Sequence, residues 1–397
     1  MPPLPPRSEP SSRPPVALAH HWLLGMRGGE KVLEQFCHLF PGAPIHTLVA
    51  RPEALSPTLR GHPLVESLLA KIPLGGKYYR HLLPLYPKLV SQLQVQPPAP
   101  LVLISDAALI KGLSVPPDSI KVCYCHSPPR YLWGLQDAYL QQNASLGPLG
   151  RTLLKTLTPL LQHFDYRAAQ GVHAFIANSE FIRARIQTHY QRDSTVIHPP
   201  VALDHFRHDR PREDFYLLVS EMVPYKRVDL AVQAFNALGK KLVVIGSGPE
   251  LRRIRSLAKP HITFLGRQPF PVLKDHFERC RAFVFPSIED FGITPLEAQA
   301  AGAPVLALGI GGALETVLPQ RTGAFFAEQS VECLLEALRH FSPADYRPED
   351  CRSNAAQFHP ALFREKIRRF LTLHFPHHFA DYPWPNTSAL DALPPAG

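Results

Sequence analysis

The sequence predicts an α/β protein with two doubly wound, Rossmann-like domains. Short apolar runs of strand length alternate with helical stretches along most of the 397 residues, a pattern typical of parallel sheets joined by right-handed crossovers. One polar stretch, at residues 210–214, interrupts the alternation. A chain of this length can bury two hydrophobic cores. We therefore expect two domains that face each other across a cleft.

Ten apolar runs are expected to form the strands of the two sheets. In the first half they occupy residues 16–24, 45–49, 101–105, 121–125 and 174–178. In the second half they occupy residues 215–220, 241–245, 262–265, 282–286 and 304–308. The predicted organisation is a disordered Pro-rich N-terminus (1–15), a first domain (16–209), a second domain (210–360), a final helix (361–376) and a loose polar tail (377–397).

The composition restricts the class of protein. Hydrophobic residues make up 45% of the chain and charged residues 19%, as in ordinary globular proteins. The net charge of +9 comes from scattered basic residues, and no nucleic-acid-binding module accompanies them. This charge favours contact with phosphorylated ligands or with an anionic membrane surface. No apolar run is long enough to span a membrane. The six cysteines show no metal-binding spacing, so we expect reduced thiols and a cytoplasmic location.

Residues 77–88 mix basic, aromatic and apolar side chains. A lid or membrane-facing helix, peripheral to the inner face of the cell membrane, is one interpretation of this amphipathic segment. An ordinary surface helix is the other. Binding to vesicles that depends on anionic lipid would separate the two interpretations.

The most informative motif lies between residues 282 and 308. An apolar strand is followed by a glycine loop, a predicted helix and a second apolar strand. Thr294 is expected to cap the helix, with Pro295 in its first turn and Glu297 three residues after the cap. The loop would direct backbone N–H groups and a helix N-terminus at one point, which favours an anion. Glu289 stands at the carboxyl end of the first strand, where open α/β sheets bind ligands.

Glu289 and Glu297, separated by seven residues, resemble the E-x7-E motif of retaining GT-B glycosyltransferases of the family 4 type. The resemblance extends over residues 16–370 and implies a GT-B fold whose final helix returns to the first domain. It also implies that Glu289 contacts hydroxyls of the transferred sugar and that Glu297 binds the nucleotide ribose. The backbone N–H groups that would hold the diphosphate are those of Gly292, Ile293 and Thr294. A structural role is the alternative for both carboxylates, with Glu297 closing its own helix in a capping box.

Lys226 and Arg227 stand at the start of another predicted helix. Two cations oppose the helix dipole there, each costing about 0.3–1 kcal/mol, unless an anion compensates them. The resemblance assigns Lys226 to the donor phosphates, together with an arginine whose place is taken here by Glu221. We expect Arg227 to supply the missing charge. The alternatives are a weaker stabilisation of the leaving group, a Glu221 that only pairs with Lys226, or cations that simply reach solvent.

Further candidates come from the first domain. Gly28 and Gly29 form a strand-to-helix turn at which backbone can approach a phosphate, although any tight turn can use such a pair. His126 lies where a buried strand meets a Pro-rich loop. The resemblance places it beside the transferred sugar and the acceptor, and an ordinary loop histidine is the alternative. His21 stands where the family branch has an aspartate. A platform for the acceptor, or packing between domains, would use Arg130, Tyr131 and Trp133.

The resemblance implies a retaining hexosyltransferase that moves a sugar from a nucleotide-diphosphate donor to an acceptor hydroxyl. The sequence has no evident acidic D-x-D motif for a metal ion, so we expect fixed cations to take its place and no cofactor to be needed. Glu289, His126 and Lys226 are its catalytic candidates. Residues 223–235 resemble a mannosyltransferase-like branch, which favours GDP-mannose over a UDP-sugar. A carbohydrate or lipid-linked acceptor, in polysaccharide or glycolipid synthesis, would be the second partner, and no nucleic acid is expected. The competing functions are a GT-B sugar phosphorylase, a non-catalytic GT-B nucleotide-binding protein and a basic nucleic-acid binder.

Overall fold

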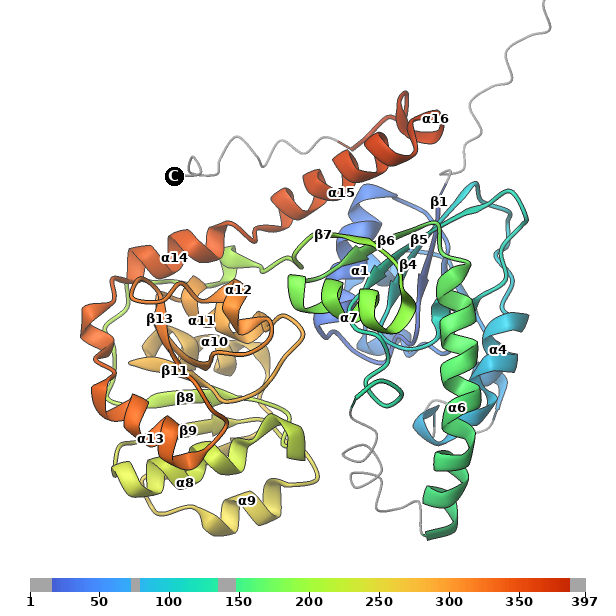
Figure 1. The fold of residues 1–397 in the computed structure, drawn as a ribbon. Coiled ribbons are helices and arrows are strands. Elements are labelled where there is room, and N and C mark those ends of the chain that lie inside the picture. The colour runs from blue at the N-terminus through green and yellow to red at the C-terminus, as the bar shows by residue number, and fades with distance from the viewer. Residues whose placement is uncertain (1–15, 73–78, 135–147, 386–397) are drawn as a thin grey trace, which may run out of the picture.

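The structure, a computed structural model, describes residues 16–72, 79–134 and 148–385. These residues form two lobes, each built around its own parallel sheet (Figure 1). Three sequence predictions fall wholly or partly outside the described residues. They concern the N-terminus (1–15), the end of the tail (386–397) and the start of the amphipathic segment (77–78).

The first lobe contains a seven-stranded sheet in the order β3-β2-β1-β4-β5-β6-β7. Its strands are β1 (Val16–His20), β2 (Ile45–Thr47), β3 (Leu64–Glu66), β4 (Leu101–Asp106), β5 (Ile120–Cys125), β6 (Ala174–Ala177) and β7 (Ser194–Val196). Its helices are α1 (Gly28–Leu39), α2 (Pro57–Arg60), α4 (Tyr86–Gln92), α6 (Pro148–Gln170) and α7 (Glu180–Tyr190). The strand order reverses between β1 and β4, and such a reversal opens a crevice at the carboxyl ends of these strands.

The second lobe contains a six-stranded sheet in the order β10-β9-β8-β11-β12-β13. Its strands are β8 (Tyr216–Val219), β9 (Leu242–Ile245), β10 (Ile262–Gly266), β11 (Ala282–Phe285), β12 (Val305–Leu308) and β13 (Gly323–Phe326). Its helices are α8 (Val228–Leu238), α9 (Leu251–Leu257), α10 (Phe270–Arg279), α11 (Ile293–Ala300), α12 (Ala313–Thr316), α13 (Val331–His340) and α14 (Pro348–Ala356). Here the strand order reverses between β8 and β11. Among the described residues, no helix combines the length and the apolar character needed to cross a bilayer.

The prediction of two parallel-sheet, Rossmann-like units is confirmed, and each of the ten predicted runs overlaps a strand. Strands β3, β7 and β13 were not predicted. They are three or four residues long and partly exposed. Short, half-buried strands leave little of the apolar pattern on which the prediction depends.

Strand β1 illustrates how the core is divided. Parallel sheets are normally covered by helices on both faces, and all five residues of β1 are buried. Ala17 and Ala19 join one hydrophobic cluster, whereas Val16 and Leu18 join the cluster on the opposite face. Because the strands themselves are buried in this way, the polar chemistry is left to the strand ends and the loops that follow them.

Helix α15 (Pro360–His374) leaves the second lobe and runs back over the first (Figure 1). Its Phe363 stacks on Phe36 of α1, with ring centroids 5.9 Å apart. The short helix α16 (Pro376–Phe379) follows. The prediction of a loose tail from residue 377 is wrong for its first residues, because Phe379 is fully buried and stacks on Trp384 with centroids 5.4 Å apart.

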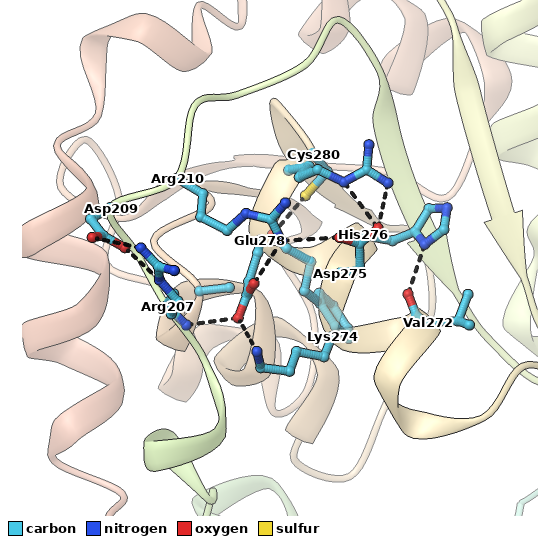
Figure 2. A network of polar contacts seen from close by, with 12 residues as sticks. Arg207, Asp209, Arg210, Val272, Lys274, Asp275, His276, Glu278 and Cys280 are labelled. Atoms are coloured by element: carbon cyan, nitrogen blue, oxygen red, sulfur yellow. Dashed lines mark hydrogen bonds and ion pairs between the residues drawn. The ribbon is translucent and has the colours of Figure 1, made fainter.

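A polar network ties the segment that enters the second lobe to helix α10 (Figure 2). Glu278 of α10 is only 1% exposed and accepts a hydrogen bond from the backbone N–H of Arg207 at 2.8 Å. Arg210 donates to the same carboxylate at 3.0 Å, and Lys274 pairs with it at 3.0 Å. The network fixes α10, which contributes three apolar side chains to the cleft between the lobes: Phe270, Leu273 and Phe277.

Candidate active site

A cleft of about 850 Å³ lies between the lobes, at the carboxyl ends of the strands. The first lobe contributes the residues before α1 and the first turns of that helix, and the second lobe contributes residues that follow β8, β9, β10 and β11. Small-molecule sites typically enclose roughly 300–1,000 Å³. The cleft therefore has the size and the position expected of a ligand site in an open α/β fold.

Lys226 and Glu289 meet in the wall of this cleft. Lys226 ends a short helical turn (Pro224–Lys226), and its carbonyl oxygen accepts a hydrogen bond from the Ser287 hydroxyl at 3.0 Å. Its ammonium forms an ion pair with Glu289, which follows β11. Both side chains line the same cavity as Thr294 of helix α11. The structure thus brings together the cation, the carboxylate and the helix start that the sequence analysis singled out.

The surroundings of Lys226 disfavour its charged form. The side chain is 17% exposed. Burial, reinforced by the Arg130 guanidinium, lowers the pKa of Lys226 from its ordinary 10.5 to about 7. The carboxylates of Asp290 and Glu221 act in the opposite direction. An anion that enters the cleft would also favour the ammonium, so anion binding and protonation of Lys226 are linked.

Arg130 reaches this site from the first lobe. Its Nη2 lies 3.1 Å from Oε2 of Glu289 and 2.7 Å from Oδ2 of Asp290. Its Nε donates to the same Asp290 oxygen at 2.9 Å. The guanidinium also lies 5.5 Å from the centroid of the Tyr225 ring. Arg130 therefore contacts the second lobe in two ways: its N–H groups pair with two carboxylates, and its guanidinium lies against the Tyr225 ring.

Helix α11 begins two residues earlier than predicted, at Ile293 instead of Pro295. Its N-cap is Gly292, whose φ of 91° suits glycine, and Thr294 lies inside the first turn without capping it. Glu297 forms no capping box either, because its Oε1 lies 2.9 Å from Nζ of Lys31 in the first lobe. Ile293, the first helical residue, faces the first lobe. Thr294 and Glu297 line the cleft, but the capping roles predicted for them are wrong.

Gly28 and Gly29 start helix α1 at a point where the lobes approach closely. A Cβ atom on Gly28 would lie 2.8 Å from Cδ1 of Ile293 in the second lobe. A Cβ atom on Gly29 would lie 3.1 Å from Cε1 of His20. A side chain at either position would press on these neighbours, and the contact of both glycines with a donor stays a prediction.

His126, which is partly buried, lies beside the buried imidazoles of His20 and His21 behind Gly29. The Ser105 hydroxyl bridges Nε2 of His126, at 2.8 Å, and Nδ1 of His20, at 3.0 Å. Burial lowers the pKa of His126 to about 3 and, against the attraction of Asp106, that of His21 to about 4. Both rings are therefore neutral near pH 7, so His126 is suited to exchange hydrogen bonds with a hydroxyl and not to act as a cation.

Some predicted residues do not reach the cleft. Arg227 adopts a left-handed backbone conformation before α8, with Nε 3.3 Å from Oδ1 of Asp229. It is not among the described residues that line the cleft. Trp133 donates its indole N–H to the buried Asp165 at 2.7 Å, and Tyr131 packs against the same first-lobe core. Of the predicted acceptor platform, only Arg130 therefore joins the charged site.

Three cations that line the cleft were not predicted from the sequence: Arg27, Lys31 and Arg267. Arg267 directly follows Gly266, the last residue of β10, and shares the cavity with Glu221. Arg267 could have been predicted to line the cleft, because it follows a predicted strand. Arg27 and Lys31 belong to the start of α1, where the glycine pair drew attention instead.

Relatives resemble this chain over part of its length. Residues 202–358, which cover the second lobe, match the family described as Glycosyl transferases group 1. A GDP-mannose-dependent alpha-(1-6)-phosphatidylinositol monomannoside mannosyltransferase of Mycobacterium tuberculosis is 29% identical over 241 residues, which cover 51% of this chain and 63% of that protein. A D-inositol 3-phosphate glycosyltransferase of Mycobacterium avium is 33% identical over 191 residues, which cover 42% of this chain and 45% of that protein. The chain thus spans less than two thirds of either relative.

Solved structures resemble both lobes. Anabaena HepE in complex with UDP and glucose aligns with a TM-score of 0.64 over 91% of this chain and 100% of that one, at 13% identity. Sucrose-phosphate synthase from Thermosynechococcus elongatus aligns with a TM-score of 0.65 over 91% and 100%, at 18% identity. Likeness at these identities concerns the fold alone. The chain has the GT-B fold, and its second lobe is similar to the glycosyltransferase group 1 family.

Proposed function

We propose that the protein is a glycosyltransferase that moves a sugar from a nucleotide-diphosphate donor to an acceptor hydroxyl. The observation that carries the proposal is the ion pair of Lys226 and Glu289, in one cleft with the start of helix α11. A cation and a helix N-terminus together favour a diphosphate. A carboxylate beside them can accept hydrogen bonds from sugar hydroxyls. The match of residues 202–358 to the glycosyltransferase group 1 family supports the same conclusion.

In the proposed reaction, the bond between the anomeric carbon and the phosphate oxygen breaks, and the diphosphate leaves with the bonding electrons. Lys226 and the free N–H groups at the start of α11 stabilise the developing charge, since preorganised donors of this kind often supply the largest catalytic term. Glu289 orients the hydroxyls of the sugar, and Glu297 binds the ribose. We propose retention at the anomeric carbon and fixed cations in the role that a metal ion has in other transferases.

We also propose identities for the donor and the acceptor. The name of the Mycobacterium tuberculosis relative specifies GDP-mannose and a phosphatidylinositol mannoside, which favours GDP-mannose and a lipid-linked or carbohydrate acceptor here. A UDP-sugar is the second choice, because the Anabaena neighbour was solved with UDP and glucose. Such an acceptor places the enzyme in polysaccharide or glycolipid synthesis, at the cytoplasmic face of a membrane.

A thermal-shift screen against GDP, UDP and ADP, each with and without its sugar, tests donor binding. Donor turnover is then compared between wild type, Glu289→Gln and a control, Glu336→Gln, which changes a 60% exposed glutamate of α13. We expect Glu289→Gln to lower turnover strongly, to a residual rate that can still be measured, and Glu336→Gln to retain the wild-type rate. Turnover that requires inorganic phosphate would indicate a phosphorylase. Binding of a nucleotide without turnover would indicate a non-catalytic protein, and stabilisation by none of the nucleotides would refute the proposal.

A further inference from the structure

Arg130 of the first lobe contacts three groups of the second lobe: Glu289, Asp290 and Tyr225. We infer that Arg130 is a positioning residue that orders Glu289 when the lobes close, so that closure and assembly of the reactive end of the cleft are one event. The inference rests on the proposed function for its kinetic consequences. The contacts themselves do not depend on it.

The loop that carries Arg130 is firmly held within the first lobe. Gln162 of α6 donates to the carbonyl of Leu132 at 2.7 Å, and Arg185 of α7 donates to the carbonyl of Trp133. The Trp133 indole is fixed in turn by its hydrogen bond to Asp165. The backbone next to Arg130 is therefore fixed to the first lobe. Whether its guanidinium reaches Glu289 then depends on the separation of the two lobes.

The geometry of the contact suits a guanidinium and not an ammonium. Two N–H groups of Arg130 converge on the Asp290 carboxylate, at 2.9 Å and 2.7 Å, and one of them also reaches Glu289 at 3.1 Å. A planar fork can make such contacts while its face lies on an aromatic ring, and Tyr225 provides that ring. The carboxylates are 13% and 16% exposed, so water competes only partly for them.

The charges explain why this contact matters for Glu289. Glu289 and Asp290 are adjacent carboxylates, and a diphosphate bound nearby would add further negative charge. With Arg130 withdrawn, Lys226 alone would face all of these anions. With Arg130 in place, Asp290 is neutralised and Glu289 is held at one oxygen, so Lys226 can share its three N–H donors with an incoming phosphate. Open lobes would thus bind nucleotide without a properly oriented Glu289.

The test compares Arg130→Met and Arg130→Lys with a control, Arg183→Met, which removes an arginine of the same lobe from an exposed pair with Glu180. Donor kcat and KM are measured, using GDP-mannose and UDP-glucose as probes. Hydrogen exchange is followed by mass spectrometry in the second-lobe segment 286–292. We expect Arg130→Met to lower kcat on the order of 10- to 100-fold, with KM changed less than about threefold. Arg130→Lys should recover only part of the loss.

Two further readouts separate positioning from a general structural role. In the Glu289→Gln background, Arg130→Met should lower kcat by less than about threefold, because a residue that acts through Glu289 has nothing left to position. Exchange in segment 286–292 should become at least about tenfold faster in Arg130→Met and stay unchanged in Arg183→Met.

Several results would overturn the inference. An unchanged kcat, a loss confined to KM, losses that multiply in the double variant, or unchanged exchange would each do so. If Arg130→Met does not fold, Arg130→Lys supplies the same comparisons. A wild-type protein that consumes no donor would refute the proposed function, whereas the exchange measurement, which needs no turnover, would still decide whether Arg130 orders the second-lobe segment.

Discussion

Donor use should decline above neutral pH because Lys226 loses its charge there. A lysine with an ordinary pKa would stay protonated throughout this range. Burial and Arg130 lower the pKa of Lys226 to about 7 in the unliganded protein. The fraction of Lys226 in the ammonium form is then about one half at pH 7, one tenth at pH 8 and one hundredth at pH 9. If only the ammonium form binds the diphosphate productively, kcat/KM for the donor falls about tenfold per pH unit above 7.

The two kinetic parameters should begin to fall at different pH values, because they report different states of the enzyme. The value of kcat/KM reports the free enzyme, whereas kcat reports the complex. A bound diphosphate favours the ammonium and raises the pKa of Lys226, so kcat should begin to fall at a higher pH than kcat/KM. The neutral imidazole of His126, with its pKa lowered to about 3, should add no acid limb above about pH 5.

The assay is donor turnover from about pH 5.5 to 9 at constant ionic strength, for wild type, Lys226→Arg and Lys241→Arg. A guanidinium stays charged over this range, so Lys226→Arg should show a flat profile even if its maximum is reduced. Lys241 is exposed, and Lys241→Arg should keep the wild-type limb. A wild-type profile that is flat to pH 9, or a limb that persists in Lys226→Arg, would refute the assignment to Lys226.

Three other predictions test the cleft and the fold. Arg267→Ala should raise donor KM about 5- to 10-fold, because one nearby charge is worth about 1 kcal/mol in open solvent. Arg227→Ala should change donor KM less than about twofold. A larger effect of Arg227→Ala than of Arg267→Ala would show that Arg227 is the cation that binds the phosphates. Glu221→Arg should lower donor KM, and unchanged or reduced activity would show that Glu221 is no handicap. Lys111, 1% exposed, pairs with Asp106 at 3.0 Å and with Asp165, so Lys111→Met should destabilise the fold by about 3–5 kcal/mol. Urea unfolding measures this, and a change below about 1 kcal/mol would contradict it.

The fold was predictable because its signal is local. The runs that became β1, β4 and β11 are mostly apolar, since parallel strands covered on both faces bury every side chain. Alternation with helical stretches then leaves few topologies. The sequence position of Glu289 after β11 gave its place in the cleft for the same reason, because strand ends define the binding edge.

The partners of the site residues were not predictable in this way. Thr294 and Glu297 match a local capping signal, yet Glu297 pairs with Lys31, 266 positions away in the sequence. Arg130 and Glu289 are 159 positions apart. Such contacts depend on how the lobes face each other, which no local pattern encodes. The prediction for Arg227 was wrong for a different reason. Its backbone is left-handed, with φ 51°, and its side chain pairs with Asp229. Such a backbone conformation in a non-glycine residue has a weak sequence signal.

The charges of the cleft indicate how a donor would be accommodated. Among the described lining residues, four are Lys or Arg and four are Glu, so the cavity is not a simple positive funnel. Two of the cations are already paired, Lys226 with Glu289 and Lys31 with Glu297. A nucleotide sugar can exchange these pairs without loss, because its hydroxyls donate to the two carboxylates while its phosphates accept from the released ammonium groups. The free protein thus keeps its cations compensated until a ligand with both kinds of group arrives. Free phosphate, which lacks the sugar and ribose hydroxyls, would leave both carboxylates exposed to its own charge, and this difference favours a nucleotide sugar over simple anions.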